Sequence, residues 1–201
     1  MKIVVMSSGG VDSSITMLLL KKEGHEVFPM HIDYGHRAEE REWKSCQQIC
    51  KHIGLEEPVR VSLSGIEYAP SSLVHPDLDI EKDAFFPTRN LLFAVLGASY
   101  AFSKSCSTVA LGILANPIFP DQTSEFLEKA EVCIGAALGV KMKLLTPLIS
   151  LDKRETLKLA REHNLPLGLT YFCHSGGEHP CRECVSCKER AAAEDILLGE
   201  V

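Results

Sequence analysis

Short apolar runs alternate along the chain with longer segments whose apolar positions recur at the spacing of a helix face. Strands are expected at residues 2–6, 26–32, 58–63, 108–114 and 143–145, and helices at residues 15–22, 37–52, 90–104, 123–138 and 152–163. Gly24 and Gly54 suit helix ends, and Asp152 suits a helix N-cap. Strands that alternate with helices predict an α/β fold with an open, parallel, five-stranded sheet and helices on both faces, which is a Rossmann-like arrangement.

One long segment interrupts this alternation. Residues 64–88 contain Pro70, Pro76 and Pro87 and show little periodicity. Long irregular segments inside a compact domain are usually functional. We therefore expect this segment to form a flap over a site.

Composition limits the number of domains and the kinds of partner. With 201 residues, of which 45% are hydrophobic, the chain suits one substantial core. A net charge of −6 supplies no basic face for duplex or tRNA, so a nucleic-acid partner is not expected. No apolar run reaches the roughly 18 residues that cross a membrane, and no charged leader precedes the first strand. We expect a cytoplasmic protein without a membrane partner.

The first strand runs directly into a loop of serines and glycines, Ser8-Gly9-Gly10-Val11-Asp12-Ser13-Ser14. The first amides of a helix have no partners within the helix, and the helix dipole adds partial positive charge there, so an anion is stabilised at this position. Gly9 and Gly10 can take positive φ and let the main chain approach phosphate, while Ser8, Ser13 and Ser14 add hydroxyl donors. The loop has neither the Gly-Lys-Ser/Thr of a Walker loop nor the spaced glycines of a dinucleotide fold. A simple Ser/Gly turn without a ligand is the alternative.

The second strand should end beside this loop, because ligands bind at the carboxyl ends of parallel strands. Its end reads His31-Ile32-Asp33-Tyr34-Gly35-His36-Arg37. Backbone atoms around Ile32 could pair with adenine, and Asp33 could reach ribose or magnesium. The alternative is a polar turn that connects a strand to a helix.

Four of the eight cysteines crowd near the C-terminus, at Cys173, Cys181, Cys184 and Cys187. Four thiolates at such spacing predict a closed, tetrahedral, structural zinc site. Three alternatives remain open: an iron–sulfur cluster, a redox dithiol at Cys181 or Cys184, and zinc completed by His174 or His179. The other four cysteines are expected to be small buried side chains: Cys46, Cys50, Cys106 and Cys133.

The loop at residues 8–14 resembles the pyrophosphate loop (PP loop) of the ATP pyrophosphatases, which activate an oxygen of the substrate by adenylylation. Together with Tyr34-Gly35-His36-Arg37, Arg89-Asn90 before an apolar helix, and the four cysteines, it resembles the 7-cyano-7-deazaguanine synthase family. The resemblance covers almost the whole chain, including Thr146-Pro147-Leu148 and Asp152-Lys153. It implies an adenine nucleotide alpha hydrolase-like fold, with a PP-loop domain at residues 1–170 and a zinc-binding segment at residues 171–201 packed on it.

The resemblance also implies an ATP-dependent ligase that adenylylates 7-carboxy-7-deazaguanine and converts it with ammonia to the amide and then the nitrile, a precursor of queuosine and archaeosine. The expected cofactors are ATP, Mg²⁺ and Zn²⁺, and pairing of two subunits is common in the family. Catalytic roles are expected for Asp12, Ser13 and Arg89. Nucleotide contacts are expected from Ser7, Ser8, Gly9, Gly10, Val11, Asp12, Ser13, Ser14, Ile32, Asp33 and Gly112, and substrate contacts from Tyr34, Arg37, Arg89, Asn90 and Asp121.

One segment departs from the family pattern. Where family members carry a polar segment ending in Tyr-Pro-Asp-Cys-Arg, this chain has Ile118 and Phe119 and keeps only Pro120 and Asp121. A divergent enzyme is therefore the alternative, one that activates another acid or attaches a deazaguanine to a protein or nucleic acid, as in anti-phage defence. A tRNA-modifying PP-loop enzyme and a regulatory module that binds nucleotide without turnover are further alternatives.

Overall fold

The structure, a computed structural model, describes residues 1–66 and 68–199 of the chain. Five strands form one sheet in the order β3-β2-β1-β4-β5, and every neighbouring pair is parallel. The strands are β1 (Lys2–Met6), β2 (Glu26–Asp33), β3 (Val59–Ser62), β4 (Thr108–Ala110) and β5 (Lys143–Leu145). The predicted α/β fold with an open, parallel, five-stranded sheet is confirmed.

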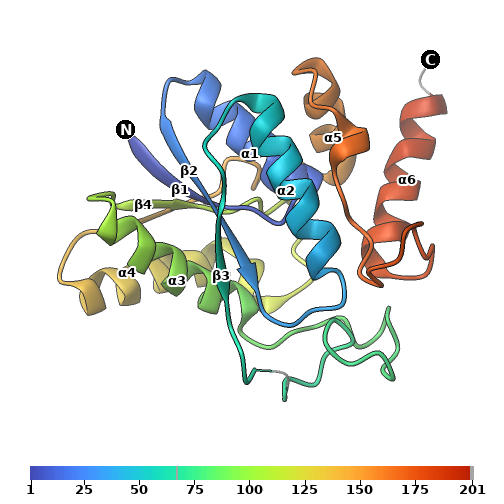
Figure 1. The fold of residues 1–201 in the computed structure, drawn as a ribbon, viewed down its shortest axis with the longest axis horizontal. Coiled ribbons are helices and arrows are strands. Elements are labelled where there is room, and N and C mark those ends of the chain that lie inside the picture. Colours follow the sequence, from blue (N-terminus) through green and yellow to red (C-terminus); the bar gives the residue numbers. More distant parts are fainter. Residues whose placement is uncertain (67, 200–201) are drawn as a thin grey trace.

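The described residues form six α-helices, of which the first five cover the two faces of the sheet while the sixth packs beside the fifth (Figure 1). They are α1 (Val11–Lys22), α2 (Glu39–Ile53), α3 (Arg89–Ser103), α4 (Ser124–Leu138), α5 (Lys153–Glu162) and α6 (Val185–Gly199), with short 3₁₀ turns η1 (Pro120–Gln122) and η2 (Leu167–Leu169). Helices α1, α2 and α5 lie on one face, and α3 and α4 lie on the other. Asp152 caps α5 as expected, because its side chain accepts a hydrogen bond from the Glu155 amide.

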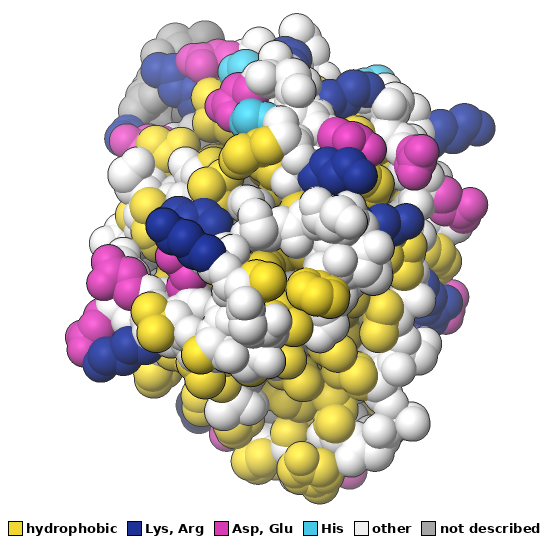
Figure 2. Space-filling model, turned by 90° about the vertical axis from the view of Figure 1, so that its left-hand side faces the viewer, with side chains coloured by type: hydrophobic (Ala, Val, Ile, Leu, Met, Phe, Trp, Pro, Cys, Tyr) yellow, Lys and Arg dark blue, Asp and Glu magenta, His cyan; other side chains and the backbone are white. Residues whose placement is uncertain are grey.

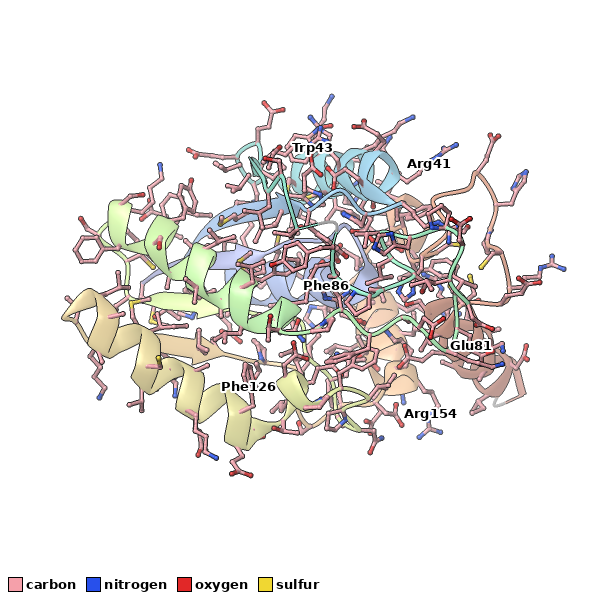
Figure 3. All side chains as sticks on the ribbon, turned by 90° about the horizontal axis from the view of Figure 1, so that it is seen from below. Arg41, Trp43, Glu81, Phe86, Phe126 and Arg154 are labelled. Carbon is pink, nitrogen blue, oxygen red and sulfur yellow. The ribbon has the colours of Figure 1, made fainter. Side chains whose placement is uncertain are left out.

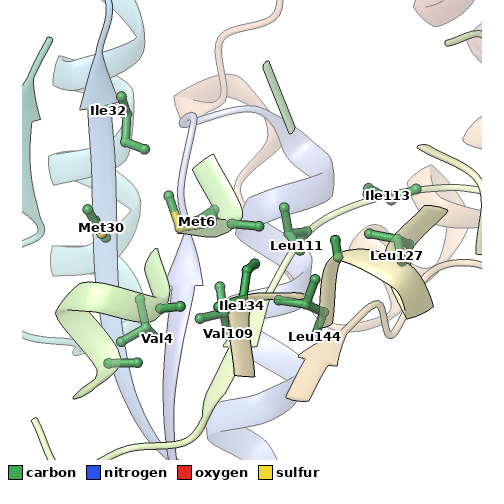
Figure 4. Packing of buried hydrophobic residues seen from close by; sticks show 14 of the residues in the cluster. Val4, Met6, Met30, Ile32, Val109, Leu111, Ile113, Leu127, Ile134 and Leu144 are labelled. Atoms are coloured by element: carbon green, nitrogen blue, oxygen red, sulfur yellow. The ribbon is translucent and has the colours of Figure 1, made fainter. Parts of the chain in front are cut away.

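The core forms two layers because the residues of β1 point alternately to the two faces of the sheet. Ile3 and Val5 pack beneath α1 and α2, whereas Val4 and Met6 pack against α3 and α4. Figure 4 shows the second layer, in which side chains of β1, β2, β4 and β5 belong to one cluster with Leu127 and Ile134 of α4. This packing fixes the sheet, and the sheet positions the loops at its carboxyl edge.

Two boundaries differ by four residues from those that the sequence predicts, whereas the others lie within two residues. Strand β4 ends at Ala110 and does not continue to residue 114, although the Leu111 amide still donates to the Leu145 carbonyl. Beyond that bond the chain leaves the sheet and Gly112 passes close to the main chain at the start of α1. Helix α1 begins at Val11, inside the serine–glycine loop, so its free amides lie in that loop.

Cys133 was expected to be buried, and this prediction is wrong. Cys46, Cys50 and Cys106 are buried, but Cys133 is exposed on α4. Helices α3 and α4 also leave apolar side chains exposed, namely Val95, Phe102 and Val132. Figure 2 shows hydrophobic side chains gathered on the lower part of this side of the molecule.

No helix in the described part of the chain is both long and apolar enough to cross a membrane.

Candidate active site

A cavity of about 300 Å³ opens at the carboxyl ends of β1, β2 and β4. Strand β1 is the switch point of the sheet, because β2 and β3 follow on one side of it and β4 and β5 on the other. Ligands of open α/β sheets bind at such a switch point. The cavity is lined by the loop after β1, the end of β2, the start of α3, the segment after β4, the first residue of α5 and the C-terminal segment.

The serine–glycine loop forms one wall of this cavity. Gly9 has a φ of 73°, and a Cβ there would lie 2.5 Å from the carbonyl oxygen of Glu42. Gly10 has a negative φ and is the residue before α1. No side chain of the described residues caps the start of this helix, so its first amides are free to bind a ligand. Ser7, Ser8, Gly10, Val11, Asp12 and Ser13 line the cavity, as do Ile32 and Gly112.

Two residues of the predicted loop serve the fold and do not line the cavity. Ser14 is fully buried, and its hydroxyl donates to the Gly10 carbonyl at 2.7 Å. Gly9 packs against α2, where the Ser45 hydroxyl donates to the Gly9 carbonyl at 2.7 Å. Gly112 has a similar reason to be glycine, since a Cβ there would lie 2.8 Å from the amide nitrogen of Ser13.

Lys153 is a site residue that the sequence analysis did not assign. Its Nζ lies 2.6 Å from Asp12 Oδ2 and 3.5 Å from Glu189 Oε2, so it joins the starts of α1 and α5 to α6. Burial lowers the pKa of Lys153, but the two carboxylates more than offset this and raise it, so the lysine stays charged. The second oxygen of Asp12, Oδ1, is buried without a hydrogen-bond partner in the described structure. A cation would satisfy this unpaired oxygen, and a phosphate group would accept hydrogen bonds from the free amides at the start of α1.

Aromatic rings and Arg89 form the opposite wall. The Tyr34 ring packs against Phe86 and Phe93, with centroids 5.4 Å away in both cases. Burial raises the pKa of Tyr34 to about 12, although Arg89 acts in the opposite direction. Arg89 therefore lies at the first turn of α3, beside the Tyr34 hydroxyl and at the edge of the cavity.

A second group missed by the sequence analysis is the pair His36 and Glu42. Nε2 of His36 lies 3.0 Å from Oε2 of Glu42, and the His36 ring stacks on Tyr34 with centroids 4.1 Å apart. Both residues line the cavity. Burial raises the pKa of Glu42, but the hydrogen bond and charge of His36 outweigh this and lower it.

The segment after β4 supplies an apolar wall. Ile113, Pro117, Ile118 and Phe119 line the cavity, and the Phe119 ring lies 5.1 Å from the ring of Phe85 in the flap. This segment therefore lines the same cavity as the serine–glycine loop. The segment predicted to form a flap contributes Leu73 and Ala84 to the lining, so part of it borders the cavity.

Besides Gly9 and Ser14, three further predicted residues do not line the cavity. Asp33 accepts hydrogen bonds from Arg60, Ser62 and its own turn at Gly35. Asp121 is buried and accepts hydrogen bonds from the amide and the side chain of Asn90, which does line the cavity. Arg37 lies in a separate open depression beside the flap and the cysteine segment.

The four C-terminal cysteines converge. Their sulfur atoms all lie within 4.8 Å of one another, and three of the residues are buried. The Cys181 amide donates to Cys173 Sγ at 3.2 Å, and the Cys184 and Cys187 amides donate to the preceding sulfur at 3.4 Å. Amide donors toward sulfur stabilise thiolates, so the donor set fits a four-coordinate metal ion.

The fold and this site together define a nucleotide-binding α/β protein of the PP-loop class. A model of the family described as queuosine biosynthesis protein QueC matches residues 2–196, and the chain belongs to this family. It is 32% identical over 201 residues to a 7-cyano-7-deazaguanine synthase of Campylobacter jejuni, covering 92% of this chain and 90% of that protein. A 7-cyano-7-deazaguanine synthase of Acetivibrio thermocellus is 34% identical over 199 residues, covering 92% and 88%.

A solved structure shares the fold at lower sequence identity. The NMN synthetase from Francisella tularensis superposes with a TM-score of 0.59 at 14% identity, covering 98% of this chain and 76% of that one. Such a likeness supports the fold assignment alone. Family membership rests on the sequence matches.

Proposed function

We propose that the protein is an ATP-dependent ligase that makes 7-cyano-7-deazaguanine from 7-carboxy-7-deazaguanine, ammonia and ATP. The observation that carries the proposal is that the serine–glycine loop and Arg89 line one and the same cavity. Membership of the QueC family supports the choice of substrate. The reaction consumes two molecules of ATP, one for each activation of oxygen.

The first step is adenylylation of the carboxylate. The amides at the start of α1, with Ser8 and Ser13, would bind the outer phosphates, and Lys153 would balance their charge. A carboxylate oxygen attacks the α phosphorus, and pyrophosphate leaves. Ammonia then attacks the carbonyl carbon and displaces AMP, which gives the amide. Attack of the amide oxygen on a second ATP releases pyrophosphate, and loss of AMP together with both protons of the nitrogen then gives the nitrile.

Arg89 would bind the substrate carboxylate, because a guanidinium matches two carboxylate oxygens. The apolar wall at Ile118 and Phe119 would contact the flat heterocycle. Ile118 is 57% exposed, so this wall leaves apolar surface for a ligand to cover. Because this wall replaces the polar segment of the family, a divergent acid substrate remains the second candidate.

Magnesium and zinc complete the proposal. Asp12 fits a magnesium ion, since its unpartnered Oδ1 is an oxygen ligand beside the phosphate loop, and such an ion would neutralise charge on the leaving pyrophosphate. Cys173, Cys181, Cys184 and Cys187 fit zinc in a structural role because four protein ligands leave no open position.

Mass spectrometry of the products tests the substrate. The protein is incubated with ATP, Mg²⁺, ammonium chloride and either 7-carboxy-7-deazaguanine or one of a panel of related acids. Conversion of 7-carboxy-7-deazaguanine to the amide and nitrile is expected. Turnover of another acid alone would replace the first candidate by the second, and absence of turnover with every acid would contradict both.

We also propose that two subunits pair. The apolar side chains exposed on α3 and α4, including Phe102 and Val132, support a self-association surface there. Light scattering should give twice the chain mass of 22.1 kDa. A mass of 22.1 kDa at micromolar concentration would contradict pairing.

A further inference from the structure

Three carboxylates line the cavity among the described residues, and they differ in what balances their charge. Asp12 and Glu189 share the ammonium group of Lys153, at 2.6 and 3.5 Å. Among the described residues, no lysine or arginine lies within ion-pair distance of Glu42, which contacts the imidazole of His36 at 3.0 Å. Glu42 is therefore the lining carboxylate whose charge remains for a cationic ligand.

The surroundings of Glu42 keep it ionised and hold it in place. Its side chain is only 18% exposed, and the histidines that face it lower its pKa, with His36 the largest of these influences. His36 is itself fixed from two sides, by stacking on Tyr34 and by Glu39, whose Oε2 lies 3.4 Å from Nδ1. His36 Nδ1 makes no hydrogen bond in the described structure, although it is buried at the cavity wall.

Glu42 and Arg89 line the same cavity. The His36 imidazole that contacts Glu42 also stacks on the Tyr34 ring, with centroids 4.1 Å apart. A carboxylate bound by Arg89 would thus share the cavity with an anionic side chain. An ordinary anion-binding site would exclude a negative group from this position, because like charges repel.

We infer that Glu42, oriented by His36, binds the ammonium ion that supplies the nitrogen and accepts a proton from it during attack. This inference rests on the proposed function. One proton leaves the ammonium ion to give ammonia, the nitrogen forms a bond to the carbonyl carbon, and the bond from that carbon to the oxygen of AMP breaks. AMP departs with the electron pair. Glu42 takes up the proton that the ammonium ion loses, and the second proton, which the nitrogen loses after attack, leaves on the phosphate group of AMP. His36 acts as a positioning residue, since it reaches the nitrogen only through Glu42.

Glu42→Gln and His36→Gln separate adenylylation from attack by nitrogen. Adenylylation is measured as exchange of labelled pyrophosphate into ATP, which needs the acid but no ammonia. Both variants should retain this exchange, which also shows that they are folded. Amide formation at low ammonium should fall about 100-fold in Glu42→Gln, the range typical of a lost proton acceptor, with a raised KM for ammonium. Glu40→Gln is the matched control, because Glu40 lies on the same helix and is exposed.

Hydroxylamine supplies a second readout, since it is a neutral nucleophile that needs no prior deprotonation. Hydroxamate formation should fall much less than amide formation in both variants, and a merely structural defect would lower the two equally. Equal loss with both nucleophiles, or unchanged ammonium kinetics in Glu42→Gln, would overturn the inference. Absence of acid-dependent exchange in the wild-type protein would instead contradict the proposed function.

Discussion

At the scale of single residues, Gly9 sits where a side chain does not fit. Its φ is 73°, and an added Cβ would lie 2.5 Å from the Glu42 carbonyl oxygen and 2.8 Å from the Ser45 Cβ. These atoms belong to α2, so the contact holds the phosphate loop against the helix that carries Glu42. The loop and the proposed ammonium site therefore depend on one close approach of two backbones.

Gly9→Ala should move this loop. Strain at positive φ costs about 1–3 kcal/mol, and displacement of the loop should lower turnover by about 100-fold. Urea unfolding and pyrophosphate release measure the two effects. Gly24→Ala is the control, because Gly24 also has positive φ, at 82°, but has no atom within 4 Å of the added carbon. Equal loss of turnover in both variants would show that the contact with α2 does not matter.

His31 makes the stability depend on pH. It is buried, and although burial lowers its pKa, the hydrogen bond and charge of Glu39 raise the pKa above 6.5 overall. Because the folded state binds this proton more tightly, the stabilisation is fully present below pH 6.5 and is lost as the pH rises through the folded pKa.

His31→Gln should therefore lose more stability in acid than in base. Urea unfolding of the variant and the wild type at pH 5.5 and pH 8.5 gives the difference at each pH. The difference in free energy of unfolding should be larger at pH 5.5. His52→Gln, on the exposed side of α2, controls for the loss of any histidine. A difference that is constant or that grows toward pH 8.5 would contradict the assignment.

At the scale of elements, the cysteine segment and α6 form one unit that reaches the cavity. The helix begins at Val185, between Cys184 and Cys187, and Glu189 one turn later meets Lys153. Arg190 stacks over Phe172 with its guanidinium 4.7 Å from the ring and also lines the cavity. A metal bound by the cysteines would therefore hold α6 in place as well as the turn before it.

Loss of the metal should consequently lower both stability and activity. Elemental analysis should find about one zinc per chain in a colourless protein. Cys184→Ser should remove the zinc, lower the Tm and lower turnover, whereas Cys133→Ser, on the exposed face of α4, should change none of these. A brown protein that contains iron would contradict zinc, and full activity without metal would contradict the role given to α6.

The element boundaries show how far the sequence predicts this structure. The bounds of β1 and β5 match the prediction because those runs are short, apolar and flanked by polar residues. The apolar run after Thr108 continues beyond β4, because residues such as Leu111 and Ile113 are buried against the core after the strand has ended. Cys133 was misjudged because the outer face of α4 is itself partly apolar, so periodicity does not distinguish its two sides.

At the scale of the whole molecule, distant segments close around the cavity. Glu81 of the flap, labelled in Figure 3, forms an ion pair with Lys188 of α6. The Arg37 amide donates to the Leu73 carbonyl at 2.8 Å. The flap and the C-terminal segment thus meet over the carboxyl edge of the sheet. Water would be excluded from the reacting groups when they are bound there, which strengthens charge interactions.

Because the cavity is built from segments that are distant in sequence, some of its residues could not be predicted from the sequence. The phosphate loop and the four cysteines are local patterns, so spacing alone predicts them. Lys153 and Asp12 are 141 positions apart, and only the packing of α1 against α5 brings them to 2.6 Å. Glu42 lies within a polar helix face, where nothing in the sequence separates it from Glu39 or Glu40.

The central claim is that the loop after β1 binds the two outer phosphates of ATP and leaves the α phosphorus open to attack. Phosphorus NMR of the products with acid, ammonium and ATP tests this most directly. The account predicts AMP and pyrophosphate from the wild-type protein, and loss of both in Asp12→Asn. Formation of ADP and inorganic phosphate in place of AMP and pyrophosphate would contradict it.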